Sequence, residues 1–426
     1  MSSLAARIAL FLLSLPALAG AADLGVNGTT LVSFEQRSTP GFERQRVIPA
    51  TQFLGIDADH LGNPNLSLHL YGWGRVDLAD RSTDEKYTDG DLTYGYLRYL
   101  FPTANGEVKA GRFFVFDGVS AEHVDGVSAR ADLARGFALS MYGGAPVRLD
   151  RADDNKGDVI IGGRVSYRIP SLFELGFSAL HEKGVTNGQT TDLKDHRQLV
   201  GGDLWLRPHK TTEFSGRISY NTATDGVAEQ SYLLTVRPSA PLSVAGEYSR
   251  YRIKDYFAAT NIRSLFNPDT GDNVQYYGGS VTYVIAKPAE VTVSYRHYNR
   301  DITGNSDRFG GEGRLTLLDN KCRAGLSYFR TEAPTGINSY HEIRGYLLHT
   351  AAKYTASVDT IAHLYDDKIF GKNTAFEVQG SAGYRLRPNL KLSGDLSYGQ
   401  NPQFNDELKG LVRLTFNYDF IKGAGK

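Results

Sequence analysis

Apolar and polar residues alternate along this chain in segment after segment. The last such segment places Val412, Leu414, Phe416, Tyr418 and Phe420 on one face and Arg413, Thr415, Asn417 and Asp419 on the other. The same pattern occurs over 159–169, 214–221, 376–387 and 390–399. A period of two is typical of strands with two unlike faces, and in a transmembrane barrel one face meets lipid and the other the lumen. A soluble sandwich also alternates, so the repetition along the chain, more than any one segment, favours a barrel.

The connections between these segments fall into two classes that alternate along the chain. One class is short and often contains proline: 62–65, 101–103, 169–171, 207–209, 237–241, 286–289 and 387–389. The other is longer and rich in Asp, Asn and Gly: 80–91, 149–158, 182–197, 254–273, 299–308, 331–338 and 366–374. Outer-membrane barrels have short periplasmic turns and longer outer loops. We therefore predict an all-β fold, a single transmembrane antiparallel β-barrel of about 22 strands (20–24), with both termini periplasmic.

The N-terminal segment indicates export. Residues Met1 to Ala22 contain one basic residue, a short apolar run and a small-residue end, which is typical of a secretory signal peptide. We expect cleavage between Ala19 and Ala22, so residues 1–22 are the signal peptide and residues 23–426 the barrel domain. The apolar run is too short to span a bilayer. The expected location is the outer membrane of a bacterial cell.

Composition excludes several other classes. The mean hydropathy of −0.33 and the lack of a long apolar run after the signal peptide exclude a helical membrane protein. The whole chain has 47 basic and 47 acidic residues, which argues against a nucleic-acid partner. Cys322 is the single cysteine, so the chain has no C-x-x-C-H motif and cannot attach its own c-type haem. We expect no cofactor on this chain.

The whole chain resembles a Gram-negative outer-membrane porin, and its end resembles the terminal strand by which the barrel assembly machinery recognises such proteins. Here Ile421 to Lys426 follow Phe420, where such chains usually stop. Two short runs, Pro49 to Asp59 and Gly118 to Arg130, look like the porins of porin–cytochrome electron conduits. That resemblance implies periplasmic and outer-surface multihaem cytochromes as partners, with haem carried by them.

The expected width also points to an occupant. A barrel of 22 strands about 4.8 Å apart and tilted by about 40° has a backbone diameter of roughly 44 Å, and barrels of this size are usually plugged. The first candidate strand, Thr29 to Arg37, lies almost at the expected mature N-terminus, which leaves no room for a plug domain before it. The best candidate for an inward-folded loop is Lys254 to Asn273. The least regular segment is Phe113 to Gly144, where Asp117-Gly118 and Asp125-Gly126 interrupt the alternation.

The alternation assigns residues to the two faces. The residues expected to line the pore are Arg164, Arg168, Arg217, Glu247, Arg296, Glu312, Arg314, Arg344, Glu377, Arg385, Lys391, Asp395 and Arg413. Their mixed signs predict little ion selectivity in an open pore and equally suit a wall against a soluble partner. The aromatic residues expected at the lipid interface are Tyr220, Tyr384, Tyr398, Phe416, Tyr418 and Phe420.

Three functional hypotheses remain open. In the first, the barrel is a wide channel that surrounds a multihaem c-type cytochrome. In the second, it is a passive diffusion porin for small hydrophilic solutes. In the third, it is an outer-membrane hydrolase that uses Ser120, His123 and Asp125. Ser120 and His123 point to opposite faces of an extended strand, which argues against such a triad, so we predict that the chain is a channel and not an enzyme. The 10 His residues show no metal-binding spacing, so we predict no metal site.

Overall fold

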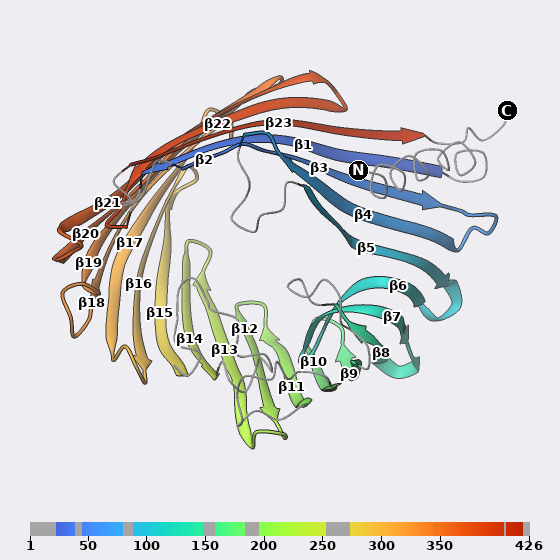
Figure 1. Ribbon diagram of the computed structural model, residues 1–426. Coiled ribbons are helices and arrows are strands. Elements are labelled where there is room, and N and C mark those ends of the chain that lie inside the picture. The colour runs from blue at the N-terminus through green and yellow to red at the C-terminus, as the bar shows by residue number, and fades with distance from the viewer. Residues whose placement is uncertain are drawn as a thin grey trace.

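The computed structural model describes residues 23–38, 45–79, 88–147, 158–183, 196–252, 273–403 and 406–420. These residues form one antiparallel sheet that closes on itself as a barrel (Figure 1). The helices in the described residues are two short 3₁₀ turns, Pro102–Ala104 (η1) and Ala134–Gly136 (η2). No helix in this part of the chain is long and apolar enough to cross a membrane. The expected signal peptide and the residues after Phe420 lie outside the described residues.

The strand segments follow one another around the wall. The first half comprises β1 (Asp23–Ser38), β2 (Gln45–Val47), β3 (Pro49–Asp59), β4 (Leu66–Asp77), β5 (Thr88–Phe101), β6 (Gly106–Asp117), β7 (Ser120–Asp132), β8 (Phe137–Pro146), β9 (Val159–Ile169), β10 (Phe173–Lys183), β11 (His196–His209) and β12 (Thr212–Asn221). The second half comprises β13 (Gly226–Ser239), β14 (Leu242–Arg252), β15 (Asn273–Ala286), β16 (Ala289–Arg300), β17 (Ser306–Leu317), β18 (Cys322–Glu332), β19 (Tyr340–Thr350), β20 (Tyr354–Ile369), β21 (Lys372–Arg387), β22 (Leu390–Gln400) and β23 (Asp406–Phe420).

The first and last strands close the barrel. β1 pairs with β23 from Leu24 opposite Phe420 to Ser38 opposite Asp406. On its other edge β1 pairs with both β2 and β3. β2 and β3 are separated only by Ile48 and run along the same partner, so they act as one wall strand and the barrel has 22 strands. The fold class and strand number predicted from the sequence are confirmed.

The two faces of the wall differ as the alternation predicts. Val358 and Val412 lie on the outer face and are 50% and 55% exposed. Asp359 and Arg413, their neighbours in sequence, point to the inner face, and each forms an ion pair with a residue of an adjacent strand. The apolar side chains therefore lie outside and the charged ones inside, the inverse of a soluble protein.

The two rims also differ. We call the rim that holds the start of β1 and the end of β23 the short-turn rim, because the chain reverses there at tight turns such as 210–211 and 287–288. We call the opposite rim the long-loop rim. Many residues of its connections lie outside the described residues, including most of the expected inward loop 254–273.

The sequence analysis predicted a loop over 366–374, and this prediction is wrong. β20 and β21 continue to a tight turn at Phe370 and Gly371, where both residues have the positive φ angles, 49° and 86°, of a hairpin turn. That the termini are periplasmic stays a prediction.

The wall is interrupted between β5 and β6. Their backbone pairing runs only from Gly95–Arg112 to Phe101–Gly106, although β5 begins at Thr88 and β6 ends at Asp117. β6 leaves the wall beside Gly111, whose φ of 130° is disfavoured for any residue with a Cβ. Figure 1 shows β6 to β10 drawn into a tighter curl than the rest of the wall.

The two-faced wall predicts an asymmetric response to charge. Val358→Lys should lower the free energy of unfolding in lipid vesicles by about 2–4 kcal/mol, because it places a charge against hydrocarbon near mid-membrane. The matched control Ser357→Lys puts the same charge on the inner face and should cost little. Urea unfolding in vesicles measures both variants, and equal losses would contradict the assignment of the two faces.

Candidate functional site

The inner face of the barrel carries ion pairs within single strands and between strands one or two apart. Among the residues assigned to the lumen, the paired ones are Arg164 with Asp203 (2.5 Å), Arg217 with Glu229 (2.7 Å), Arg296 with Glu247 (2.5 Å), Arg314 with Glu312 (2.5 Å), Arg344 with Asp359 (3.4 Å) and Arg413 with Asp395 (3.6 Å). Glu377 borders a small cavity with His363 and Glu407. Arg168, Arg385 and Lys391 form no ion pair with a described residue. The pore-lining role of these residues stays a prediction.

One hairpin leaves the wall and enters the lumen. We call residues Phe113 to His123, the end of β6 and the start of β7, the inward hairpin. Its two arms pair with each other down to Asp117 opposite Ser120, but β6 has no backbone pairing with β5 here, and β7 pairs with β8 only from Val124 onward. The hairpin instead packs on the inner faces of β9, β10, β11 and β13.

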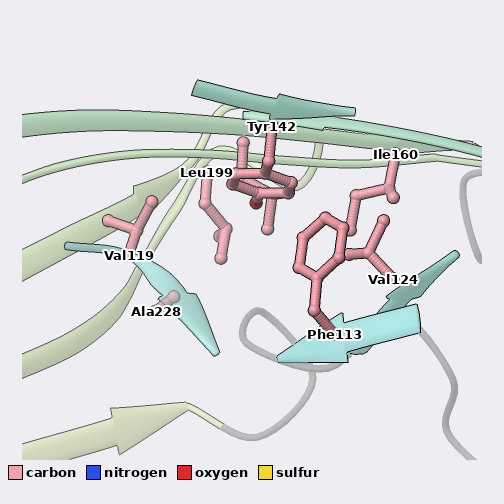
Figure 2. Close-up of a cluster of buried hydrophobic side chains, with 8 residues drawn as sticks. Phe113, Val119, Val124, Tyr142, Ile160, Leu199 and Ala228 are labelled. Carbon is pink, nitrogen blue, oxygen red and sulfur yellow. The ribbon is translucent and has the colours of Figure 1, made fainter. Parts of the chain in front are cut away.

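An apolar cluster fixes the inward hairpin (Figure 2). The buried members are Phe113, Val119, Val124, Tyr142, Ile160, Leu180, Leu199 and Ala228. Figure 2 shows the labelled members of this cluster in the space between the hairpin and the surrounding wall strands. Full burial of a large apolar side chain contributes about 1.5–3 kcal/mol. A polar lumen therefore contains one dry core, and that core determines the position of the hairpin.

Arg164 anchors the tip of the hairpin at one side. Its guanidinium donates to Asp203 at 2.5 and 3.0 Å and to Glu174 at 3.0 Å, and lies 3.6 Å from Asp117 at the hairpin tip. Ser140 on β8 also donates to Asp117. The sequence assigned Arg164 to the pore wall, and the structure shows that it joins the wall to the hairpin.

Arg197 anchors the hairpin at the other side. It lies 2.5 Å from Glu122 of the hairpin and 3.0 Å from Glu182 of β10. The three side chains are only 6%, 15% and 10% exposed. Two carboxylates this close repel each other, and the guanidinium between them compensates for that repulsion and for the loss of water.

The turn of the hairpin sits tightly against the wall. Gly118 has a φ of 58°, and a Cβ there would collide with Ser178 of β10. The Val119 amide donates to Ser178 Oγ at 3.0 Å, and the Tyr142 hydroxyl donates to Ser120 Oγ at 2.8 Å. These bonds satisfy polar groups that would otherwise be buried without partners.

The candidate hydrolase residues are not assembled into a catalytic site. Ser120 accepts a hydrogen bond from Tyr142, His123 stacks on Phe114 with ring centroids 4.1 Å apart, and Asp125 binds Arg112. Each side chain has a different partner, and among the described residues no hydrogen bond or ion pair joins two of the three. Among the described residues, no group of His, Cys, Asp and Glu could hold a metal ion.

Arg112 bridges the gap that the inward hairpin leaves beside β5. Its guanidinium binds Asp125 at 2.7 and 2.9 Å, Asp91 at 3.2 Å and the carbonyl oxygen of Leu92 at 3.0 Å. One side chain thus replaces part of the missing backbone ladder. This matters because an unpaired strand edge is costly in a membrane.

Beside this gap, β3, β4 and β5 present aromatic rings to the lumen. Phe53 and Tyr71 are stacked with centroids 6.3 Å apart, Tyr71 and Tyr94 at 5.5 Å, and Tyr94 lies 5.9 Å from Tyr96. A β-bulge at Thr93 changes the register of β5 between its two ends. The sequence analysis missed this aromatic wall because it expected polar side chains on the inner face, where Phe53 and Tyr71 place rings, and because the bulge breaks the alternation in β5.

The aromatic residues expected at the lipid interface gather near the two rims. Tyr384, Phe416, Tyr418 and Phe420 lie near the short-turn rim, and Tyr220 and Tyr398 near the other. The ring centroid of Tyr418 lies 6.0 Å from that of Phe416 and 6.4 Å from that of Phe420. Their contact with lipid stays a prediction.

The fold resembles that of outer-membrane receptors and transporters. The ferric enterobactin receptor PfeA of Pseudomonas aeruginosa (mutant R480A_Q482A) has a TM-score of 0.58 at 10% sequence identity over 93% of this chain and 81% of the receptor chain. The copper transporter OprC has a TM-score of 0.58 at 12% identity over 93% and 80%. A chain of the E. coli P pilus tip assembly intermediate PapC-PapD-PapK-PapG has a TM-score of 0.56 at 10% identity over 95% and 62%.

At these identities the similarity establishes the fold alone. No family model matches the sequence, and no curated protein matches it either. The chain therefore has the large-barrel fold found in outer-membrane receptors, transporters and pores, and its function must be argued from its own lumen.

Loss of the buried Arg197 should lower the unfolding free energy far more than loss of an exposed arginine. Arg197→Leu leaves Glu122 and Glu182 close together without a cation and should lower the unfolding free energy by about 3–5 kcal/mol. The control Arg344→Leu breaks a pair that is about half exposed and should cost less than about 1 kcal/mol. Denaturant unfolding in vesicles compares the two, and similar losses would contradict the buried anchor.

The seating of the hairpin can be tested by cross-linking. The Val119 amide lies 3.0 Å from Ser178 Oγ, so Val119→Cys with Ser178→Cys, in a Cys322→Ala background, should form a disulfide on mild oxidation. Phe116 lies on the opposite face of the hairpin and is 77% exposed, so Phe116→Cys with Ser178→Cys should not cross-link. Non-reducing electrophoresis after proteolysis between the two sites gives the yield of each.

Proposed function

We propose that this protein is a wide outer-membrane channel whose lumen holds a protein partner, and that the partner is a multihaem c-type cytochrome passing electrons across the membrane. The supporting observation is the width of the barrel relative to what fills it. A 22-strand barrel has a backbone diameter of roughly 44 Å. Among the described residues only the inward hairpin enters this space, and it covers one side of it.

The surface chemistry of the lumen suits a protein occupant. The wall from β12 to β20 carries paired charges, including Glu290 and Glu312 on either side of Arg314 along an inner groove of about 700 Å³. The opposite wall carries Phe53, Tyr71 and Tyr94. Interfaces between proteins combine aromatic anchors with polar contacts in this way. A purely aqueous pore has no need of half-buried rings.

The two runs that resemble the porins of electron conduits fall on these same features. The run Pro49 to Asp59 is β3, which carries Phe53, and the run Gly118 to Arg130 begins in the inward hairpin. Cys322 is the only cysteine, so haem in this channel belongs to the partner. The lipid of the outer membrane and the barrel assembly machinery are the other partners that this proposal requires.

The inward hairpin favours a second candidate function. In a passive diffusion porin for small hydrophilic solutes, an inward segment narrows the lumen and selects by size. A dry core and two arginine anchors hold this hairpin against the wall, as a constriction requires. In the conduit a partner protein fills the rest of the lumen, whereas in the porin the rest of the lumen is open to water and solutes.

Purification from a host that expresses multihaem cytochromes tests the proposal. The barrel should co-purify with haem-bearing chains, detected by haem staining and absorbance, and the isolated barrel should show a large, unselective conductance in planar bilayers. A barrel that always purifies without haem, and conducts in small stable steps, would overturn the conduit and support the porin. In that case Arg164→Ala, which frees the hairpin tip, should raise the conductance.

A further inference from the structure

The short-turn rim carries a row of cations without ionic partners. We call it the basic rim and define it by one exposed residue at each of six turns: Arg168, Arg207, Arg237, Lys287, Arg323 and Arg385. None of these forms an ion pair within the described part of the chain. The contrast with the inner wall is sharp, because most charges deeper in the lumen are paired.

The basic rim borders about half of the mouth of the pore and is directed at the lumen, not at lipid headgroups. Arg168 lies on the same face of β9 as Arg164, and Arg207 on the same face of β11 as Asp203, both of which point into the lumen. Arg323 borders the same inner groove as Arg314. The positive charge is therefore directed at whatever enters the channel from this end.

The cations are close enough to act together. From Arg168 to Arg323 neighbouring members are two strands apart, or about 10 Å along the rim, which is close to the screening length of about 8–10 Å at physiological salt. Arg323 and Arg385 are four strands apart, or about 20 Å. The nearby carboxylates Glu174 and Glu290 are held by Arg164 and Arg314. Glu213, which accepts a hydrogen bond from Trp205, and Asp319 in the β17–β18 turn offset two of the charges. The arc from Arg168 to Arg385 extends over twelve strands, or about 60 Å, which exceeds what a small anion can contact.

We infer that the basic rim is the docking surface for an acidic, carboxylate-rich protein that enters the barrel at its short-turn end. This inference rests on the proposed function and adds the charge of the partner and the end at which it enters. Complementary charge steers encounter and fixes orientation more than it adds affinity. The paired charges and aromatic rings deeper in the lumen then provide the closer contacts.

Binding of fluorescein-labelled poly-L-glutamate to the barrel in zwitterionic lipid nanodiscs tests the inference directly. The triple variant Arg207→Glu, Arg237→Glu and Arg323→Glu should raise the Kd about tenfold, and about 1 M salt should abolish wild-type binding. The control Lys183→Glu, Arg300→Glu and Lys368→Glu changes the net charge equally at the long-loop rim and should leave the Kd within about twofold. Fluorescence anisotropy measures all three proteins.

Other outcomes separate this inference from the proposed function. Equal binding of poly-L-glutamate to the wild type and the rim variant would overturn the basic rim as a docking surface. So would a loss, in the rim variant only, of the thermal stabilisation given by anionic lipid, because the rim would then bind headgroups. Equal co-purification of haem-bearing chains with the wild type and the rim variant would support the conduit and contradict the basic rim as a docking surface. A wild type that binds poly-L-glutamate but never co-purifies with haem would contradict the conduit and support the docking surface.

Discussion

Inside a bilayer a strand can satisfy its amide groups only against another strand, because hydrocarbon offers neither donors nor acceptors. This requirement joins β1 to β23 and makes the sheet a closed wall. Each strand must then show one face to lipid and the other to the lumen, so residues such as Val412 and Arg413 alternate along it. The even number of strands brings the start of β1 and the end of β23 to the same rim. The inward position of the charges, the width of the lumen and the position of the loops at the two rims all follow from this closed sheet.

The gap between β5 and β6 departs from this requirement, and the structure compensates for it locally. The end of β6 gives up its pairing with β5, and Arg112 binds the Leu92 carbonyl and Asp91 in place of backbone groups. In return the inward hairpin buries Phe113 and Val119 in an apolar core against β9, β10, β11 and β13. Lost backbone pairing is exchanged for apolar burial and for the anchors at Arg164 and Arg197. The barrel thus forms a fixed projection into its lumen with strands of the wall itself.

The lumen has three kinds of surface, and each suits a different stage of contact with an occupant. The short-turn rim offers unpaired cations that act over distance, the inner wall offers paired charges that are already satisfied, and β3 to β5 offer aromatic rings. Paired charges remain polar without strongly favouring one ion. An occupant guided by the rim would therefore meet a wall that neither repels it nor binds it tightly at every position. This gradation is what the proposed protein occupant requires.

The sequence by itself determined the wall, because alternation and turn chemistry are local properties: a period of two marks a two-faced strand wherever it occurs, and the count of 22 followed from the turns between strands. The same local signals failed at 366–374, where polar residues suggested a loop but the strands continue to Phe370. Only the tertiary structure decided the course of the inward hairpin. Glu122 meets Arg197, and Val119 meets Ser178, across 75 and 59 residues of sequence. The broken alternation at Asp117-Gly118 and Asp125-Gly126 indicated an irregularity, but the inner surface that receives the hairpin exists only once β9 to β13 have paired. A contact of that kind depends on the closed barrel, and no single segment contains it.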